Sequence, residues 1–242
     1  MRGSNTTRSL LCISIAMSLL IGLLIAGCGA PSQKEVVEKS KNEQVESKKN
    51  ALLISNLGFL PYQNNPYLTD MYSYYVVGKL KNDNKKYTCT KANCSATLYN
   101  ASGAVIGNFR GKVAPVYPGQ ERWYMSSAID TSPETPARAE LKISSETWSR
   151  VAPSNIPKFE ILQKNLLPGD YQTKITGIVR YEGKETIDIA VTGVILNSSG
   201  NPIACGRADI EKVSAGDHPY SVETFVGNID AASADVTAFE TK

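Results

Sequence analysis

The chain has 242 residues, of which 42% are hydrophobic and 20% are charged, an ordinary composition for globular domains. A net charge of +3 gives no argument for a nucleic-acid partner, and a single histidine limits the chemistry of any catalytic site. This length is sufficient for one large domain or two small ones.

The first 27 residues have the character of a secretory signal. A positively charged start precedes a mostly apolar run from Leu10 to Ala26, which ends in the sequence LIAGC at Leu24 to Cys28. That ending resembles the lipobox of bacterial lipoproteins, whose cysteine accepts a diacylglyceryl group before cleavage. The resemblance implies a signal peptide over 1–27 and a lipid anchor on Cys28, and two or more acyl chains anchor stably. The alternative is an uncleaved signal anchor, although the apolar run is near the short limit for spanning a bilayer.

Residues 28–50 are rich in lysine and glutamate and contain no aromatic residue. Such a segment cannot bury enough apolar surface to offset its ordering entropy, so we expect a flexible tether between the membrane and the folded part. The alternative is a short solvated helix, because lysine and glutamate are good helix formers. The mixed charge argues against a polybasic lipid-binding patch.

From Ala51 onward, short segments enriched in β-branched and aromatic residues alternate with turn residues. The strands expected in the first part are Ala51–Ile54, Tyr72–Leu80, Lys86–Cys89, Cys94–Tyr99, Ala104–Arg110, Glu121–Ile129 and Ala139–Ile143. No segment shows a convincing amphipathic helical period, so the pattern predicts an all-β protein.

One strand–turn–strand stretch occurs twice, at 98–107 and at 195–204. Gly-centred turns at Gly119 and Gly216 follow the two copies at matched spacing. The same register matches Trp123 with Tyr220, which favours a core position for both, and matches 137–143 with 234–240. The repeat predicts two tandem antiparallel β-sandwiches of immunoglobulin or fibronectin type, one over 51–148 and one, with its linker, over 149–242. Trp148 lies in the expected linker and is predicted to pack between the domains.

Both copies also resemble a known domain family. The segments Gly78–Asn82, Ala96–Asn100 with its Ser-Gly turn, Val105–Gly107 and Pro118-Gly119 resemble the FxLYD-type domain of bacterial lipoproteins. Leu98 and Tyr99 match the family's Phe-x-Leu-Tyr-Asp strand, whereas Ala96 and Asn100 replace its Phe and Asp. The resemblance implies a secreted or membrane-anchored β-sandwich and carries over no catalytic residue.

Five cysteines remain to be assigned. Cys12 belongs to the signal and Cys28 takes lipid, which leaves three in an extracytoplasmic setting where disulfides persist. Cys89 and Cys94 enclose a four-residue loop between strands that we expect to pair, and facing positions of such a hairpin can approach disulfide geometry. We predict a Cys89–Cys94 disulfide that contributes only about 2 kcal/mol, because the loop that it closes is short. Cys205 would then be a small, unpaired core residue.

The sequence contains few residues in patterns that would form a metal site or a catalytic site. No further cysteine or histidine lies near Cys89 and Cys94 to complete a zinc site, so we predict no metal and no cofactor. His218 lies in a predicted turn and is expected to be exposed, with the neighbouring Asp217 pointing away from it. The sequence has no Gly-x-Ser-x-Gly elbow and no Gly-rich phosphate loop, and its acidic residues are scattered. These observations predict a protein that is not an enzyme.

Tyrosines gather before and within one predicted strand, at Tyr62, Tyr67, Tyr72, Tyr74 and Tyr75. Alternation places Tyr72 and Tyr74 on one face and Tyr75 on the other. Tyr72 has a counterpart in Tyr171 of the second copy, which favours a core role for that pair. The candidate binding aromatics are therefore Tyr62, Tyr67, Tyr74 and Tyr75, and the alternative is ordinary half-buried strand aromatics.

Together these features predict a lipoprotein on the extracytoplasmic face of a bacterial cell membrane. We expect it to act as a binding or structural module of the envelope, with an envelope protein or a glycan as partner. Two alternatives remain open. One is an envelope enzyme with an unrecognised carboxylate site, which would need a cleft holding at least two acidic side chains. The other is the solute-binding protein of a transporter, which usually needs larger α/β lobes.

Overall fold

The computed structural model describes residues 50–64, 72–227 and 233–241, and residues 48–242 form one compact unit. The predicted signal peptide, the lipidated Cys28, the tether up to residue 49 and Tyr67 lie outside the described residues. In the described ranges the secondary structure is β apart from a short 3-10 turn, η1 (Pro153–Asn155). No helix in these ranges is long and apolar enough to cross a membrane.

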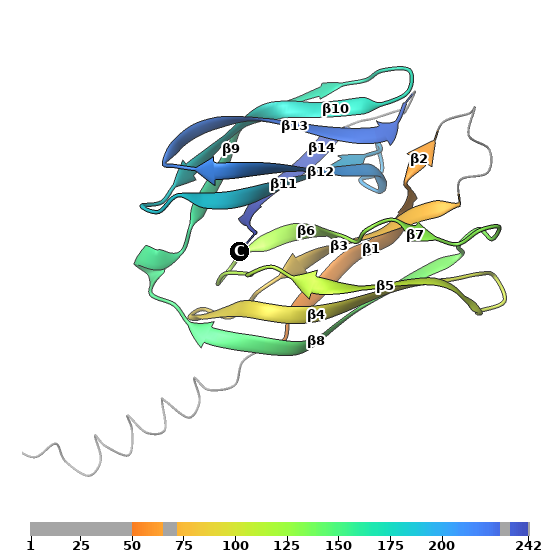
Figure 1. Cartoon of the computed structure of the whole chain (residues 1–242), viewed down its shortest axis with the longest axis horizontal. Helices are drawn as coiled ribbons and strands as arrows, with labels where there is room; N and C mark the ends of the chain where they lie inside the picture. Colours follow the sequence, from red (N-terminus) through yellow and green to blue (C-terminus); the bar gives the residue numbers. More distant parts are fainter. Residues whose placement is uncertain (1–49, 65–71, 228–232, 242) are drawn as a thin grey trace, which may run out of the picture. The chain divides into compact units, whose positions relative to one another are not determined.

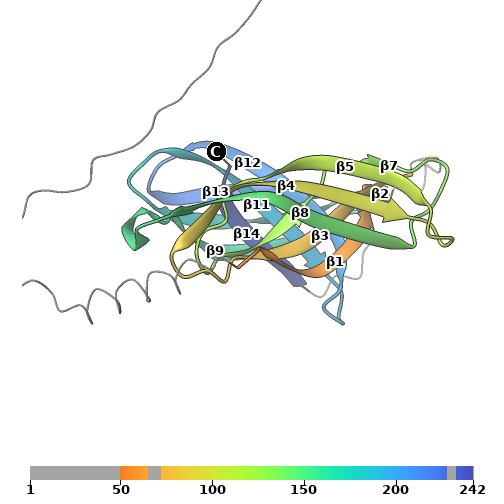
Figure 2. The same cartoon turned by 90° about the horizontal axis from the view of Figure 1, so that it is seen from below.

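The strands of the first part form what we call the N-terminal sandwich. They are β1 (Leu53–Pro61), β3 (Ser73–Lys81), β4 (Tyr87–Tyr99), β5 (Val105–Val113), β6 (Glu121–Met125), β7 (Ile129–Asp130) and β8 (Arg138–Arg150). One antiparallel sheet has the order β1-β3-β6, with the short β7 also paired to β3. The other has the order β5-β4-β8, and Figure 2 shows β4 between its two neighbours.

The remaining strands form the C-terminal sandwich. They are β9 (Lys158–Leu167), β10 (Thr173–Glu182), β11 (Ile187–Leu196), β12 (Pro202–Val213), β13 (Gly216–Val226) and β14 (Ser233–Glu240). Its sheets have the orders β13-β10-β9 and β12-β11-β14 (Figure 1). The two-residue strand β2 (Gln63–Asn64) leaves the N-terminal sandwich and pairs in parallel with the end of β13.

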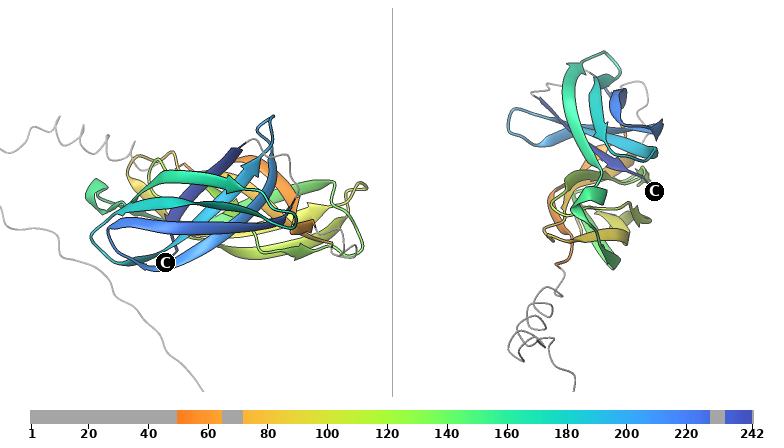
Figure 3. Two further views of the ribbon diagram at one scale, coloured as in Figure 1. Left: turned by 90° about the horizontal axis from the view of Figure 1, so that it is seen from above. Right: turned by 90° about the vertical axis from the view of Figure 1, so that its left-hand side faces the viewer.

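The two sandwiches repeat one topology. Leaving aside the two-residue strands β2 and β7, each has its first, second and fifth strands in one sheet and its third, fourth and sixth in the other. The chain therefore crosses between the sheets as it does in sandwiches of the immunoglobulin type. In Figure 3 the orange-to-green strands of one sandwich and the teal-to-blue strands of the other form two separate groups. The predicted all-β class and the duplicated sandwich architecture are confirmed.

The repeated strand–turn–strand stretch forms the same hairpin in both sandwiches. Leu98 pairs with Gly107 and Ile195 pairs with Ala204, and both Leu98 and Ile195 are fully buried in their own cores. In each turn an asparagine, Asn100 or Asn197, accepts backbone N–H bonds on its side-chain oxygen from the residues two and four positions later. The turn glycines have φ of 85° and 78°, a conformation that favours glycine.

A third apolar cluster joins the sandwiches, and we call it the junction cluster. Its buried members are Leu60, Val77, Trp123, Val194 and Cys205, with Tyr75, Met125 and Leu196 packed against them. These residues come from the β1-β3-β6 sheet of one sandwich and the β12-β11-β14 sheet of the other. Both sheets are therefore covered on two faces, which explains the continuous run of buried residues from Ile189 to Ile195 in β11.

The register corrects the expected position of Trp123. The pairing places Tyr124 opposite Gly78 and Tyr220 opposite Gly177, so the counterpart of Tyr220 is Tyr124 rather than Trp123. A shift by one residue reverses the face of a strand. Tyr124 consequently enters the N-terminal core, and Trp123, only 1% exposed, enters the junction cluster.

The last strands are also offset from the predicted register. Leu98 pairs with Ala139 and Ile195 pairs with Ala234, so Ala234 matches Ala139 rather than position 137. This offset is two residues and keeps the same face inward, which is why Leu141 and Val236 are both buried.

The predicted Cys89–Cys94 disulfide is wrong. Both cysteines lie on the single strand β4 rather than across a hairpin, and both are free, buried thiols. Five residues along a strand span roughly 16 Å, which is far beyond disulfide geometry. Register shifts between β4 and β8 at this segment, with Ser145 at φ 53°, turn Cys89, Ala92 and Cys94 all toward the core.

The expected linker is shorter than predicted. β8 continues to Arg150, so Trp148 is a strand residue that pairs with Cys89 and packs against the N-terminal core. The prediction that Trp148 packs between the domains is wrong, and Trp123 occupies that place instead.

Candidate functional site

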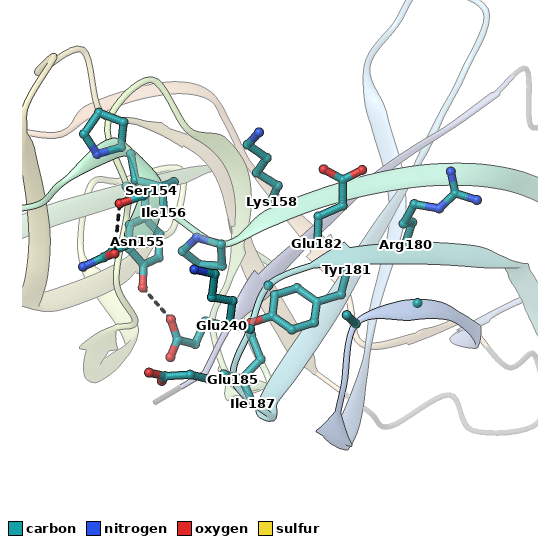
Figure 4. A pocket seen from close by; sticks show the side chains of 17 residues that line it. Ser154, Asn155, Ile156, Lys158, Arg180, Tyr181, Glu182, Glu185, Ile187 and Glu240 are labelled. Atoms are coloured by element: carbon teal, nitrogen blue, oxygen red, sulfur yellow. Dashed lines mark hydrogen bonds between the residues drawn. The ribbon is translucent and has the colours of Figure 1, made fainter.

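A cleft of about 900 Å³ lies where the linker meets the C-terminal sandwich (Figure 4). Its walls come from the segment around η1, the end of β10 with the turn that follows it, the start of β13 and the end of β14. Its charged lining residues are Lys158, Arg180, Glu182, Lys184, Glu185 and Glu240. The cleft therefore offers three cations and three carboxylates to a polar ligand.

Tyr181 forms the floor of the cleft. Its ring stacks on Phe159 of β9 at a centroid distance of 5.4 Å. A Cβ at position 183 would clash with the Tyr181 hydroxyl, so Gly183 is what allows the ring to lie across the turn. Burial, and then the charge of Glu240, raise the pKa of Tyr181 above 10.0, so its hydroxyl is a neutral donor and acceptor at neutral pH.

Two hydrogen-bonded pairs, each with one carboxylate, lie at the rim of the cleft. Tyr117, which precedes the Gly119 turn, donates its hydroxyl proton to the Glu240 carboxylate. Burial, and then this bond, raise the pKa of Tyr117 well above its ordinary value. Arg180 donates from Nε and Nη2 to the two carboxylate oxygens of Asp217 at 2.7 and 3.1 Å, and this bond lowers the pKa of Asp217.

The cleft holds more than the two acidic side chains that the enzyme alternative requires. In Figure 4 Glu182 lies on the opposite side of the Tyr181 ring from Glu185 and Glu240. Glu182 and Glu185 are exposed, and Glu240 is half-buried with Tyr117 as donor. None of these three carboxylates therefore lies in an apolar pocket of the kind that favours a general acid. In the described ranges no group of three or more His, Cys, Asp or Glu side chains is placed to hold a metal ion.

His218 has no catalytic arrangement with its neighbour. Its Nε2 lies 2.6 Å from the Ser214 carbonyl oxygen, while Asp217 is bound to Arg180. The side chain is half-buried at the start of β13 rather than exposed in a turn, because strand pairing extends to Gly216.

The structure separates the candidate binding aromatics. Tyr74 packs against the N-terminal core with its ring 6.0 Å from that of Phe59. Tyr75 faces the junction cluster, and burial, followed by the nearby Cys205 and Tyr62, raises its pKa. Tyr62 lies 5.4 Å from Tyr75 by ring centroids. Each of these rings therefore has at least one face in an internal contact.

Two other residues with predicted roles have clear positions. Tyr171 is 57% exposed, so the core position predicted for it is wrong. Cys205 is buried as predicted, although in the junction cluster, and burial raises the pKa of its thiol well above the ordinary value.

Sequence reasoning missed the cleft residues because they come from five segments that the fold alone brings together. It also missed Arg122 of β6, which is 2% exposed. A signal for Arg122 existed, since an arginine directly before a Trp-Tyr pair in a predicted strand must be either at the surface or specifically accommodated.

No family model matches the chain, and no curated protein matches it. Among solved structures, the chain is similar to red sea bream transglutaminase, with 8% identity and a TM-score of 0.24 over 88% of this chain and 34% of that one. It is also similar to a glycosyl hydrolase family 2 member from Bacteroides cellulosilyticus, with 8% identity and a TM-score of 0.22 over 74% and 30%. For a β-glucuronidase from Ruminococcus gnavus, identity is 10% and the TM-score 0.17 over 81% and 47%. The chain spans less than half of each of these proteins, and TM-scores this low carry no argument about function.

Proposed function

We propose that the chain is a lipid-anchored, extracytoplasmic binding module of a bacterial envelope. The observation that carries this proposal is the LIAGC sequence at Leu24 to Cys28, after an apolar run and before a charged segment. The folded part supports it, since it consists of two β-sandwiches with a cleft that is lined by side chains of both charges. The resemblance to FxLYD-type domains belongs to the same proposal.

Metabolic labelling with a palmitate analogue tests the anchor. We expect the wild-type chain to be labelled and the Cys28→Ala variant to lose the label, because the thiol of Cys28 is the proposed site of acylation. Cys12→Ala is the matched control and should keep the label, since Cys12 lies within the segment that is removed. Label that persists in Cys28→Ala would contradict the proposal.

The enzyme alternative rests on one specific observation, the three carboxylates of the cleft. Photo-crosslinking on intact cells distinguishes binding from catalysis. A crosslinker in place of the exposed Lys184 should capture an envelope protein or a glycan, and one at the exposed turn residue Ser102 should not. Turnover of a glycan that is abolished by Glu185→Gln, without a captured partner, would favour the enzyme.

A further inference from the structure

A second cavity, of about 410 Å³, lies beside the junction cluster and is lined from both sandwiches. β5 and β6 contribute Lys112, Arg122 and Trp123, and the C-terminal sandwich contributes Arg207 and Phe239. Lys91 of β4 also lines it. Among the described residues that line this cavity there are four cations and no carboxylate, which sets it apart from the mixed-charge cleft.

Arg122 is the buried cation among the described residues that line this cavity. The residue is 2% exposed, and its Nη2 donates to the Ala114 carbonyl oxygen at 2.9 Å. Its buried Nε has no hydrogen-bond partner in the described structure. An unsatisfied buried donor on a charged group is costly, so such an atom calls for an acceptor.

The contacts of the Arg122 guanidinium are with a carbonyl oxygen and an aromatic ring rather than with a carboxylate. The guanidinium carbon lies 3.8 Å from the centroid of the Phe239 ring, a cation–π contact. Burial, and then the charge of Arg207, lower the pKa of Arg122 to about 9, so the side chain is still protonated at neutral pH.

Arg207 is a second arginine of this cavity, and it is exposed to solvent. Its guanidinium carbon lies 5.7 Å from the same Phe239 ring, and its Nε and Nη2 donate to one oxygen of Asp209, which is not among the cavity residues. Trp123 also lines the cavity, and its buried indole N–H has no acceptor in the described structure. Two of the residues that line this cationic cavity thus carry a buried donor without an acceptor, and the cavity has a size suited to a small molecule.

We propose that this cavity binds a small ligand through an oxyanion, a carboxylate or a phosphate, which is held by the guanidinium groups of Arg122 and Arg207 and attracted by Lys112. Planar guanidinium groups suit either anion. This proposal goes beyond the envelope-module function and holds whether or not Cys28 carries lipid.

Tryptophan fluorescence of the full chain in detergent micelles tests the proposal. A Trp148→Phe background leaves Trp123, a cavity residue, as the single tryptophan. Inorganic phosphate and citrate are titrated separately at constant ionic strength, and we expect a saturable change with at least one of them. The anion that binds more tightly identifies phosphate or carboxylate as the ligand group. Saturation with neither would overturn the proposal.

Substitutions of the cavity cations test where the anion binds. Arg207→Gln should weaken binding by about tenfold, because a charge-assisted contact is lost. Arg138→Gln is the matched control, since Arg138 is likewise an exposed arginine that lies over an aromatic ring but is outside both this cavity and the mixed-charge cleft. Arg122→Met should abolish binding where it folds, and Arg207→Gln with Lys112→Gln gives the same test without altering a buried residue. Equal weakening in Arg138→Gln, or unchanged binding in the double variant, would overturn the proposal.

Discussion

The two sandwiches have one topology but bury different outer faces. The N-terminal sandwich uses its β1-β3-β6 sheet at the junction, and the C-terminal sandwich uses its β12-β11-β14 sheet, which is not the equivalent one. The contact is therefore heterologous, as between head-to-tail subunits, rather than a pseudo-twofold pairing. A duplicated chain can thus keep the two cores alike while a few outward-facing side chains, Trp123 above all, form an interface that joins the copies.

The largest expected effect comes from removing Trp123. The variant Trp123→Ala should lower the free energy of unfolding by about 3–5 kcal/mol, since a fully buried indole leaves a cavity. The loss should also separate the unfolding of the two sandwiches, and urea unfolding followed by circular dichroism measures both. The control Trp148→Ala removes a half-buried ring at one sandwich's own core and should leave a single transition. A single transition in Trp123→Ala would contradict the role given to this residue.

The equivalent core positions give the next effect. Leu98→Ala and Ile195→Ala should each cost about 2–5 kcal/mol, because both side chains are fully buried in the same place of the repeated hairpin. Urea unfolding at one temperature compares them. If the two losses of unfolding free energy differ by more than a factor of two, the shared hairpin does not contribute equally to the stability of the two sandwiches.

Alkaline pH compares a second equivalent pair, Tyr124 and Tyr220. Burial raises the pKa of Tyr124 and of Tyr220 above 10.0. Above about pH 10 the unfolded chain releases these protons while the folded chain holds them more tightly, so stability present below that pH falls by at most about 1.4 kcal/mol per pH unit for each tyrosine. Tyr124→Phe and Tyr220→Phe should each reduce this slope in urea unfolding between about pH 9 and pH 11. An unchanged slope in both variants would disprove that these two buried tyrosines cause the loss of stability at alkaline pH.

A smaller effect is expected from the ion pair that crosses the junction. Lys79 Nζ lies 2.7 Å from Asp235 Oδ2, with both side chains partly exposed. A double-mutant cycle with Lys79→Met and Asp235→Ala should give a coupling below about 1 kcal/mol that falls with added salt. The pair Lys174–Glu223, also at 2.7 Å but within one sandwich, is the matched control. A much stronger coupling across the junction would show that charge, rather than the junction cluster, holds the sandwiches together.

Reduction should have no effect at all. Cys89 and Cys94 are buried free thiols, and burial raises the pKa of Cys89 to about 11. Dithiothreitol should therefore leave the free energy of unfolding unchanged, whereas a disulfide here would have contributed about 2 kcal/mol. Thiol titration of the unfolded chain without reductant should find Cys89, Cys94 and Cys205 free, and a single reactive thiol among them would restore the disulfide.

The features that the sequence predicts correctly are local. The Asn-to-Gly turns and the alternating apolar residues around Leu98 and Ile195 specify their hairpins within a few residues of chain. The face of Trp123 depends on a one-residue register that spacing cannot fix, because a single offset exchanges core and surface. The cysteine prediction failed for a related reason, since a bulge and a hairpin loop look alike when both are short and polar. The cleft and the Arg122 cavity each draw on segments far apart in the chain, which only the packed fold unites.

The two-residue strand β2 has a consequence for solubility. Without β2, β13 would be the edge strand of its sheet, where unpaired backbone groups invite pairing with another chain. β2 occupies the end of that strand beside Val226, and Tyr62 packs 5.7 Å by ring centroids from the partly exposed Phe225. Each molecule thus carries its own blocking strand, so that this end of the sheet is already paired when many copies are crowded together.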